Sequence, residues 1–296
     1  MKFLSYIHKD KEHIGVLSGD ERKVLQISRI IGNERYKDMN LFIEEVTETD
    51  LEIISQVLVN EKQLGIPLEE VRLTAPITRP RHDIICVGVN YESHLKESTL
   101  ALKDEHLSER RSPVYFSKRT TRIIGQDELI EGFFEIDDEL DYEVELAVII
   151  GKGGRDIPRE KAEEHIFGYS IFNDISSRNL QREHLQWYKG KSLDTHCVLG
   201  PWIVHKSVMA FPPELDVESR VNLETRQKSN TRLFLHDIPT LISDFSRGLT
   251  LEPGDIIATG TPAGVGMGFS PPRFMKKGDL VECEIEGIGI LRNRIR

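Results

Sequence analysis

The stretch LDYEVELAVIIGK, residues 140–152, predicts both a core strand of the fold and a pair of acidic residues that could form a site. Its β-branched and apolar residues, followed by a glycine, favour a β-strand. Side chains on a strand alternate between two faces, so Glu143 and Glu145 share one face with Ala147 and Ile149. The opposite face is wholly apolar and must pack against a core: Tyr142, Val144, Leu146, Val148 and Ile150.

Two carboxylates two residues apart on a strand repel each other and resist burial unless a cation lies between them. A divalent metal ion would resolve this, and so would an edge strand whose acidic half faces solvent; the strand alone leaves both open. A third acid, Asp174, ends another apolar stretch, GYSIFND. Three carboxylates without Cys or His favour Mg²⁺, Mn²⁺ or Ca²⁺ over zinc. An EF-hand is excluded because its glycine is missing and the segment is a strand.

The composition of the chain argues against a nucleic-acid-binding protein and against a membrane protein. The chain has 296 residues, of which 30% are charged, and a net charge of −10. This argues against a nucleic-acid binder, which usually has a basic face. No apolar run approaches the ~20 residues that span a bilayer, and the N-terminus lacks the features of a signal peptide. Three widely spaced cysteines, Cys86, Cys197 and Cys283, suggest neither disulfides nor a zinc ribbon. We therefore expect a cytoplasmic protein without membrane or nucleic-acid partners.

The chain divides into two predicted units at a proline-containing linker near residues 76–80. Residues 1–75 are predicted to form a small N-terminal α+β domain, with strands at 3–7, 13–17 and 24–27 and a helix over 40–58. Residues 80–296 are predicted to form the catalytic domain. Its strands are expected at 84–90, 114–118, 167–171, 202–204, 221–224, 255–259 and 279–285, and its helical segments at 91–110 and 161–165. Many short strands with few long helices predict an α+β fold that is predominantly β, a barrel or roll.

His94 and Glu97 are three residues apart, so on a helix they share a face and can hydrogen-bond. Such a pair can hold one imidazole tautomer and leave the other nitrogen to take a proton. A solvated face of a charged helix explains the same spacing. Lys191 follows a glycine, but Leu185 stands where a phosphate loop needs glycine. The loop GTPAGVGMG, residues 260–268, lacks nucleotide-binding spacing and suits a backbone turn beneath a ligand.

Taken together, these motifs resemble the fumarylacetoacetate hydrolase family over about residues 80–296. The segments that carry the resemblance are VGVNY (87–91) with His94 and Glu97, DYEVEL (141–146), NDIS (173–176), GKSLD (190–194), LGP (199–201) and GTPAGVG (260–266). The resemblance implies the mixed β-roll fold of this family, whose members are often homodimers. The sequence departs from the family pattern at two places, which concern the identity of the substrate. Asn179 stands where many members have Asp. The segment Arg119-Thr120-Thr121-Arg122, after Lys118, differs from the usual segment of the family.

The resemblance also implies an enzyme with a defined set of site residues. Glu143, Glu145 and Asp174 are expected to hold Mg²⁺ or Mn²⁺, with Ca²⁺ possible in a crystal. The expected catalytic residues are His94, Glu97 and Lys191. His94 and Glu97 are expected to form a dyad on a mobile lid. The residues expected around the substrate are Arg178, Gln181, Lys118 and Thr261.

The implied substrate is a small 2-oxo or 1,3-dicarbonyl acid. The leading hypothesis is hydrolytic cleavage of a carbon–carbon bond in an acylpyruvate, through an enolate that the metal and Lys191 stabilise. Decarboxylation of an oxaloacetate-type acid, or isomerisation of 2-hydroxyhepta-2,4-diene-1,7-dioate, would use the same enolate. A non-catalytic module that binds metal and an oxo acid is the further alternative.

Overall fold

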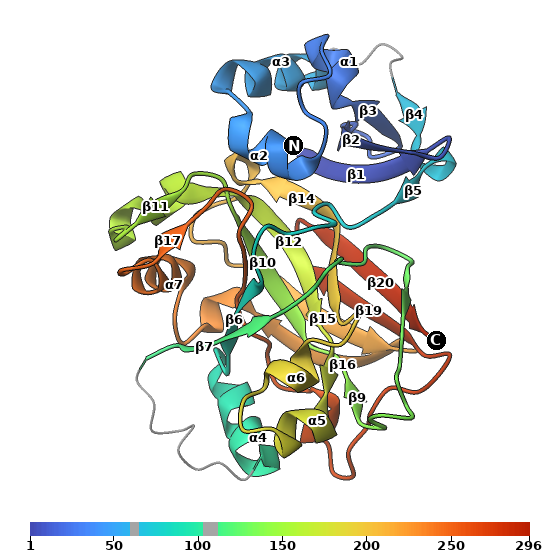
Figure 1. The fold of residues 1–296 in the computed structure, drawn as a ribbon, viewed down its shortest axis with the longest axis vertical. Coiled ribbons are helices and arrows are strands. Elements are labelled where there is room, and N and C mark those ends of the chain that lie inside the picture. Colours follow the sequence, from blue (N-terminus) through green and yellow to red (C-terminus); the bar gives the residue numbers. More distant parts are fainter. Residues whose placement is uncertain (60–64, 103–111) are drawn as a thin grey trace.

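The computed structural model describes residues 1–59, 65–102 and 112–296. The N-terminal part of the chain forms the upper body in Figure 1. Its elements are β1 (Lys2–His8), β2 (Lys11–Leu17), β3 (Lys23–Gln26), α1 (Ile27–Ile31), α2 (Met39–Glu45), α3 (Glu48–Val59), β4 (Ile66–Pro67), η1 (Leu68–Glu70) and β5 (Arg72–Leu73).

The rest of the chain is rich in strands and has short helices. Its first half contains β6 (Ile84–Gly88), α4 (Glu92–Leu102), β7 (Val114–Lys118), β8 (Leu129–Ile130), β9 (Leu140–Asp141), β10 (Val144–Ile150), β11 (Gly154–Arg155), η3 (Arg159–His165), β12 (Ile166–Asp174), β13 (Ser176–Ser177), α5 (Arg178–Glu183) and α6 (Tyr188–Lys191). Its second half contains β14 (Cys197–His205), η4 (Lys206–Val208), β15 (Asp216–Val221), β16 (Glu224–Asn230), η5 (Thr231–Leu233), α7 (Ile238–Phe245), β17 (Thr250–Leu251), β18 (Ile256–Ala258), η6 (Gly266–Gly268), β19 (Leu280–Ile285) and β20 (Gly289–Ile295).

Two large sheets contain most of these strands, and the pairs β11-β17 and β13-β9 form two small ones. The main sheet runs β4-β3-β2-β1-β14-β12-β10-β18-β6-β7, with β5 beside β1, and a smaller sheet runs β16-β15-β19-β20-β8. Most pairs are antiparallel, whereas β18 pairs with β6 and β20 with β8 in parallel. The fold is therefore α+β and predominantly β, with mixed sheets, as the sequence predicted.

The strand β10 lies in the interior of the main sheet, between β12 and β18. One of its faces, including Val144 and Val148, packs on the smaller sheet and α7, whereas Ala147 and Ile149 pack with residues of the N-terminal helices. Every residue of β10 is buried. This rules out the edge-strand explanation of the two glutamates, because no half of the strand faces solvent.

The N-terminal strands belong to the same main sheet. Phe3 of β1 pairs with Ile203 of β14, and the antiparallel pairing joins the two parts of the chain (Figure 1). The periodicity of a sequence cannot predict such a pairing. It shows which side chains share one face of a strand, but not which strand lies beside it in the sheet. The division into units at 1–75 and 80–296 stays a prediction.

Three local predictions need correction. The helix expected over 40–58 is two helices, because Val46 is extended and the hydroxyl of Thr47 accepts the Asp50 amide hydrogen to start α3. The strand expected at 221–224 is the end of β15, a turn and the start of β16. Asn222 and Leu223 have φ of 52° and 69°, the left-handed region that two-residue hairpin turns use. The stretch 140–152 is not one strand, since β9 pairs with β13 before β10 begins.

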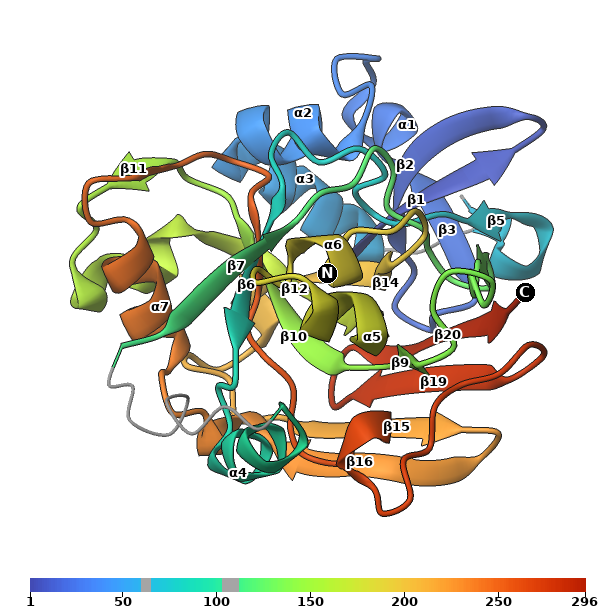
Figure 2. The ribbon, with the colours of Figure 1, turned by 60° about the horizontal axis from the view of Figure 1, so that its bottom comes forward.

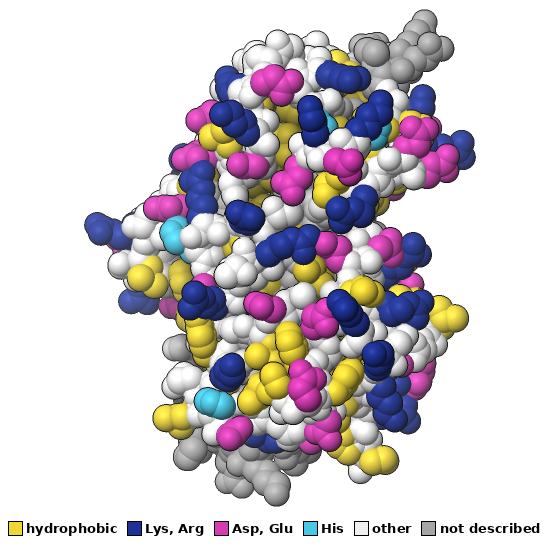
Figure 3. Space-filling model, turned by 45° about the vertical axis from the view of Figure 1, so that its right-hand side comes forward, with side chains coloured by type: hydrophobic (Ala, Val, Ile, Leu, Met, Phe, Trp, Pro, Cys, Tyr) yellow, Lys and Arg dark blue, Asp and Glu magenta, His cyan; other side chains and the backbone are white. Residues whose placement is uncertain are grey.

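The surface is mixed in charge. On the face in Figure 3, Lys and Arg side chains alternate with Asp and Glu, and no basic stripe is seen on the part of that face that is described. Within residues 1–59, 65–102 and 112–296, no helix combines the length and the apolar character needed to cross a bilayer.

Candidate active site

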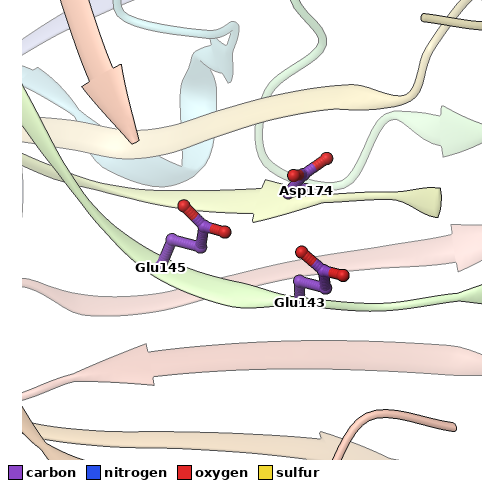
Figure 4. Close-up of side chains that lie close together, drawn as sticks. All are labelled: Glu143, Glu145 and Asp174. Carbon is purple, nitrogen blue, oxygen red and sulfur yellow. The ribbon is translucent and has the colours of Figure 1, made fainter. Parts of the chain in front are cut away.

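Three carboxylates converge at one end of the main sheet. Glu143 immediately precedes β10, Glu145 lies within it, and Asp174 is the last residue of β12. Val144 is paired with Asn173, so the antiparallel register brings these strand ends together. Ligand oxygens of all three side chains lie within 4.8 Å of one another (Figure 4). Glu143, Glu145 and Asp174 are 4%, 2% and 0% exposed, so solvent does little to relieve their mutual repulsion.

Buried cations neutralise two of these carboxylates. The Lys191 ammonium donates to Oε2 of Glu143 and to Oδ2 of Asp174, both at 2.8 Å. The Lys118 ammonium contacts Oδ1 of Asp174 and donates to the Ile175 carbonyl at 2.7 Å. Arg178 lies 2.7 Å from Oε1 of Glu143. Burial alone raises the pKa of Glu143, but Lys191 and Arg178 outweigh that effect and lower the pKa well below its usual range.

The same contacts keep Lys191 protonated. Burial alone lowers the pKa of Lys191, but Asp174 and Glu143 outweigh it and raise the pKa above its ordinary value. Lys191 therefore provides a fixed positive charge in the site. A charge held in place before reaction can stabilise an anion that forms beside it without the cost of reorganisation.

Glu145 differs from its two neighbours, since no ion pair with a described residue reaches its carboxylate. Its Oε2 accepts the backbone N–H of Gly260 at 2.8 Å. Burial, then Asp174 and Glu143, raise the pKa of Glu145 well above its ordinary value. The side chain is under-neutralised, which a further cation beside it would correct.

A divalent cation fits this arrangement. Carboxylate oxygens are the ligands that Mg²⁺ and Mn²⁺ prefer. Two oxygens on opposite sides of an Mg²⁺ ion lie about 4.2 Å apart, so oxygens within 4.8 Å of one another need little adjustment to share one ion. The assignment of Glu143, Glu145 and Asp174 as metal ligands stays a prediction, and the structure brings the three together as that prediction requires.

The His94–Glu97 pair faces the carboxylates. His94 Nδ1 is 2.9 Å from Oε2 of Glu97, and His94 Nε2 is 3.2 Å from the hydroxyl of Ser98. His94 is only 5% exposed, whereas the solvated side of α4 carries the ion pair of Lys96 with Glu92. The solvated-face explanation is therefore wrong for His94. The helix expected over 91–110 is described only to Leu102, and residues 103–111 lie outside the described residues.

A small cavity lies between His94 and the carboxylates of Glu143 and Glu145. It encloses about 20 Å³, enough for one or two water molecules. Its wall includes residues of α4, α5 and α6, the helices that Figure 2 brings forward. The predicted site residues in its wall are His94, Glu143, Glu145, Arg178, Gln181, Lys191 and Thr261. A substrate larger than this space requires part of the wall to move.

All four predicted substrate-binding residues, Arg178 included, have protein partners. Gln181 accepts a hydrogen bond from Arg178 at 2.9 Å. The hydroxyl of Thr261 donates to the Val144 carbonyl at 2.9 Å and accepts from Gln227 at 2.7 Å. Lys118 is fully buried against Asp174 and is not in the cavity wall. Their substrate-binding roles stay predictions, and in this arrangement Lys118 positions Asp174.

Sequence reasoning missed several residues of the site. Asp141 is completely buried, and its Oδ2 accepts from Arg178 at 2.9 Å, so it holds the arginine that contacts Glu143. Asp141 belongs to the same DYEVEL motif as Glu143 and Glu145, so its position in the sequence could have indicated a place in the site. Phe116 and Trp187, whose rings lie 5.3 Å apart, and Ser98 complete the wall. Nothing in their local sequence separates them from ordinary core or loop residues.

The chain is similar to known proteins in both sequence and fold. The family model "Fumarylacetoacetate (FAA) hydrolase C-terminal" matches residues 83–296. The chain is 42% identical to oxaloacetate tautomerase YisK of Bacillus subtilis (strain 168), over 97% of this chain and 94% of the relative. Its fold is similar to that of a fumarylacetoacetate hydrolase, EaFAH, from psychrophilic Exiguobacterium antarcticum, with a TM-score of 0.83, 38% identity and coverage of 100% and 99% of the two chains.

A third similar protein connects the fold to a metal ion. It is maleylpyruvate hydrolase from Sphingobium sp. SYK-6, solved in complex with manganese (II) ion and pyruvate, with a TM-score of 0.77, 29% identity and coverage of 100% and 98% of the two chains. The family match covers most of the chain, and the relatives are enzymes. The chain is therefore an enzyme of the fumarylacetoacetate hydrolase family.

Proposed function

We propose that the enzyme catalyses metal-dependent proton transfer in a small 2-oxo acid, interconverting the keto and enol forms of an oxaloacetate-type substrate. The observation that carries this proposal is the cavity wall that His94 shares with Lys191, Glu143 and Glu145. The relative named oxaloacetate tautomerase, 42% identical over nearly the whole chain, supports the choice of substrate class.

The carboxylates of Glu143, Glu145 and Asp174 would hold Mg²⁺ or Mn²⁺. When bound, the ion supplies positive charge that polarises the 2-oxo group and stabilises negative charge on its oxygen. Lys191 adds a second positive charge beside Glu143 and Asp174. Arg178 fixes the carboxylate of Glu143 at 2.7 Å and is itself fixed by Asp141, so the orientation of the cluster is set before substrate arrives.

The dyad performs the proton transfer. Glu97 accepts the Nδ1–H of His94, which leaves Nε2 of His94 free to act as the base. Nε2 removes a proton from the methylene carbon next to the 2-oxo group and passes that proton to the 2-oxo oxygen, so that the enol forms with no net gain or loss of atoms and His94 is neutral again. The reverse sequence returns the keto acid. Ser98, 3.2 Å from Nε2, can exchange this contact for the substrate.

Acylpyruvate hydrolysis, the leading hypothesis from sequence, receives less support than tautomerisation of an oxaloacetate-type acid. Hydrolysis needs an attacking water in addition to the substrate, whereas tautomerisation needs only the proton transfer that the two reactions share. The manganese and pyruvate complex of the similar maleylpyruvate hydrolase keeps hydrolysis as the second candidate. Decarboxylation would leave His94 without a proton to remove.

A direct comparison of reactions tests the proposal. The purified enzyme with Mn²⁺ is given the enol form of oxaloacetate, and the decay of enol absorbance is compared with pyruvate release from oxaloacetate and from acylpyruvates. We expect tautomerisation to exceed both by at least tenfold in kcat/KM, and His94→Gln to abolish most of that rate. Faster pyruvate release from an acylpyruvate would favour hydrolysis instead.

The sequence-based expectations of a homodimer and a cytoplasmic location stay proposals. Sedimentation equilibrium of the purified enzyme measures its oligomeric state, and a fluorescent fusion in cells measures its location. A single species of 33.9 kDa across a hundredfold range of concentration would contradict the dimer.

A further inference from the structure

The glycine-containing loop of residues 260–268 binds carboxylates through its backbone. The N–H of Gly260 donates to Glu145 at 2.8 Å, and the N–H of Gly264 donates to Glu97 at 3.0 Å. The N–H groups of Gly266 and Met267 donate to Asp141 at 2.6 and 3.1 Å. One loop therefore contacts a predicted metal ligand, the dyad and the carboxylate that holds Arg178.

Glu97 is held through both of its oxygens. Oε1 accepts the N–H of Gly264, and Oε2 lies 2.9 Å from Nδ1 of His94. The side chain is 14% exposed. The loop fixes the Glu97 carboxylate, and the carboxylate in turn fixes the imidazole. The orientation of His94 therefore depends on whether the carboxylate can reach the loop.

Gly268 provides the space for this contact. A Cβ atom added at Gly268 would lie 1.8 Å from Oε1, 2.2 Å from Cδ and 2.5 Å from Cγ of Glu97. All three of these nearest atoms belong to the one glutamate side chain. Any residue other than glycine at position 268 would therefore occupy the place of the Glu97 carboxylate.

We propose that Gly268 is a positioning residue: its missing side chain forms the seat of the Glu97 carboxylate, and the seated carboxylate aims His94 at the metal cluster. The seat has a fixed place relative to the cluster, because Asp141 links the loop to Arg178 and Arg178 to Glu143. This inference rests on the proposed role of the dyad for its effect on rate, whereas the seat itself can be tested without activity.

The test is Gly268→Ala in the full-length enzyme. The added methyl group meets only the flexible end of a glutamate, so the fold is expected to persist. We expect kcat to fall at least tenfold, Mn²⁺ affinity to stay within twofold, and hydrogen exchange in residues 92–102 to become faster. Gly19→Ala is the matched control, because a Cβ at Gly19 meets no atom within 4 Å; its values should equal those of the wild type.

A double-mutant cycle separates the seat from a general structural effect. If Gly268 acts through Glu97, then Gly268→Ala should cause no further loss of kcat in a Glu97→Ala background. Equal losses in both backgrounds would overturn the proposal, as would wild-type exchange and activity in Gly268→Ala. Gly268→Ala could make hydrogen exchange in residues 92–102 faster while His94→Ala keeps full activity. That result would support the seat of Glu97 and would contradict the proposed catalytic role of the dyad.

Discussion

At the scale of the residue, the site is defined by unequal neutralisation of buried acids. Glu143 and Asp174 each contact two buried cations, whereas the carboxylate of Glu145 has, among the described residues, only a backbone N–H as its partner. Removing one partner of a buried ion pair costs about 3–5 kcal/mol because the other charge is left buried and unpaired, so loss of Lys118 or Lys191 should destabilise the fold as well as change the charge of the site. The alternation of LDYEVEL made the two glutamates predictable. The cations that pair with them come from distant segments, which no local pattern connects.

His94→Ala should lower turnover by about 10²–10⁴, because it removes the base and leaves the carboxylate cluster intact. Steady-state kinetics on oxaloacetate enol measure the loss, and Mn²⁺ affinity should stay nearly unchanged. Lys96→Ala is the control, since Lys96 pairs with Glu92 on the solvated side of the same helix. A rate for His94→Ala equal to that of Lys96→Ala on every 2-oxo acid would remove His94 as the base.

At the scale of the element, α4 has two different sides. His94 and Ser98 are buried toward the site, whereas Glu92 and Lys96 face solvent. The helix reaches the loop at residues 260–268 through the Glu97 carboxylate. The sequence predicted a helix with a dyad, but not its seat, because the contact with Gly264 spans 167 positions. The dyad was expected on a mobile lid, and in this structure its His94 lies in the cavity wall.

A four-carbon acid is larger than the 20 Å³ cavity, so part of the cavity wall must move before the acid can enter, and we expect α4 to be the part that moves. Oxalate, a small 2-oxo acid analogue, should then stabilise the closed position. We expect slower hydrogen exchange in residues 92–102 when oxalate is added to the Mn²⁺-loaded enzyme, with α7 unchanged as the internal control. The same exchange with and without oxalate, at a concentration where calorimetry shows binding, would argue against a ligand-gated helix.

At the scale of the whole molecule, the main sheet passes through both parts of the chain. β1 joins β14, and the imidazole of His205, at the end of β14, packs against Phe3 and Phe167 with ring centres 6.1 and 5.3 Å away. The strands of each part were predictable from alternation and turn residues. Their order in the sheet was not, because pairing depends on which apolar faces meet in three dimensions.

The burial of His205 predicts an acid-sensitive stability. Burial, with the N-terminal amine and Lys206 nearby, lowers the pKa of His205 to about 4 from an ordinary 6.5. Below pH 6.5 the unfolded chain takes up a proton that the folded chain does not, so the free energy of unfolding falls until the pH approaches 4. The loss from this group is about 2 kcal/mol between pH 7 and 4.5.

Urea unfolding of the wild type and of His205→Phe at pH 7 and 4.5 measures this effect. Phenylalanine keeps the ring contacts with Phe3 and Phe167 and cannot be protonated, so the variant should lose less stability on acidification than the wild type. The same loss in both proteins would show that His205 does not contribute to the acid sensitivity.

The central claim is that Glu143, Glu145 and Asp174 form one divalent-cation site. The most direct test is calorimetric titration of the metal-free enzyme with Mn²⁺, repeated with Glu145→Gln, which keeps the size of the side chain and removes its charge. We expect one ion per chain in the wild type and affinity at least tenfold weaker in the variant. Absence of Mn²⁺ and Mg²⁺ binding by the wild type, or equal affinity in Glu145→Gln, would contradict the account.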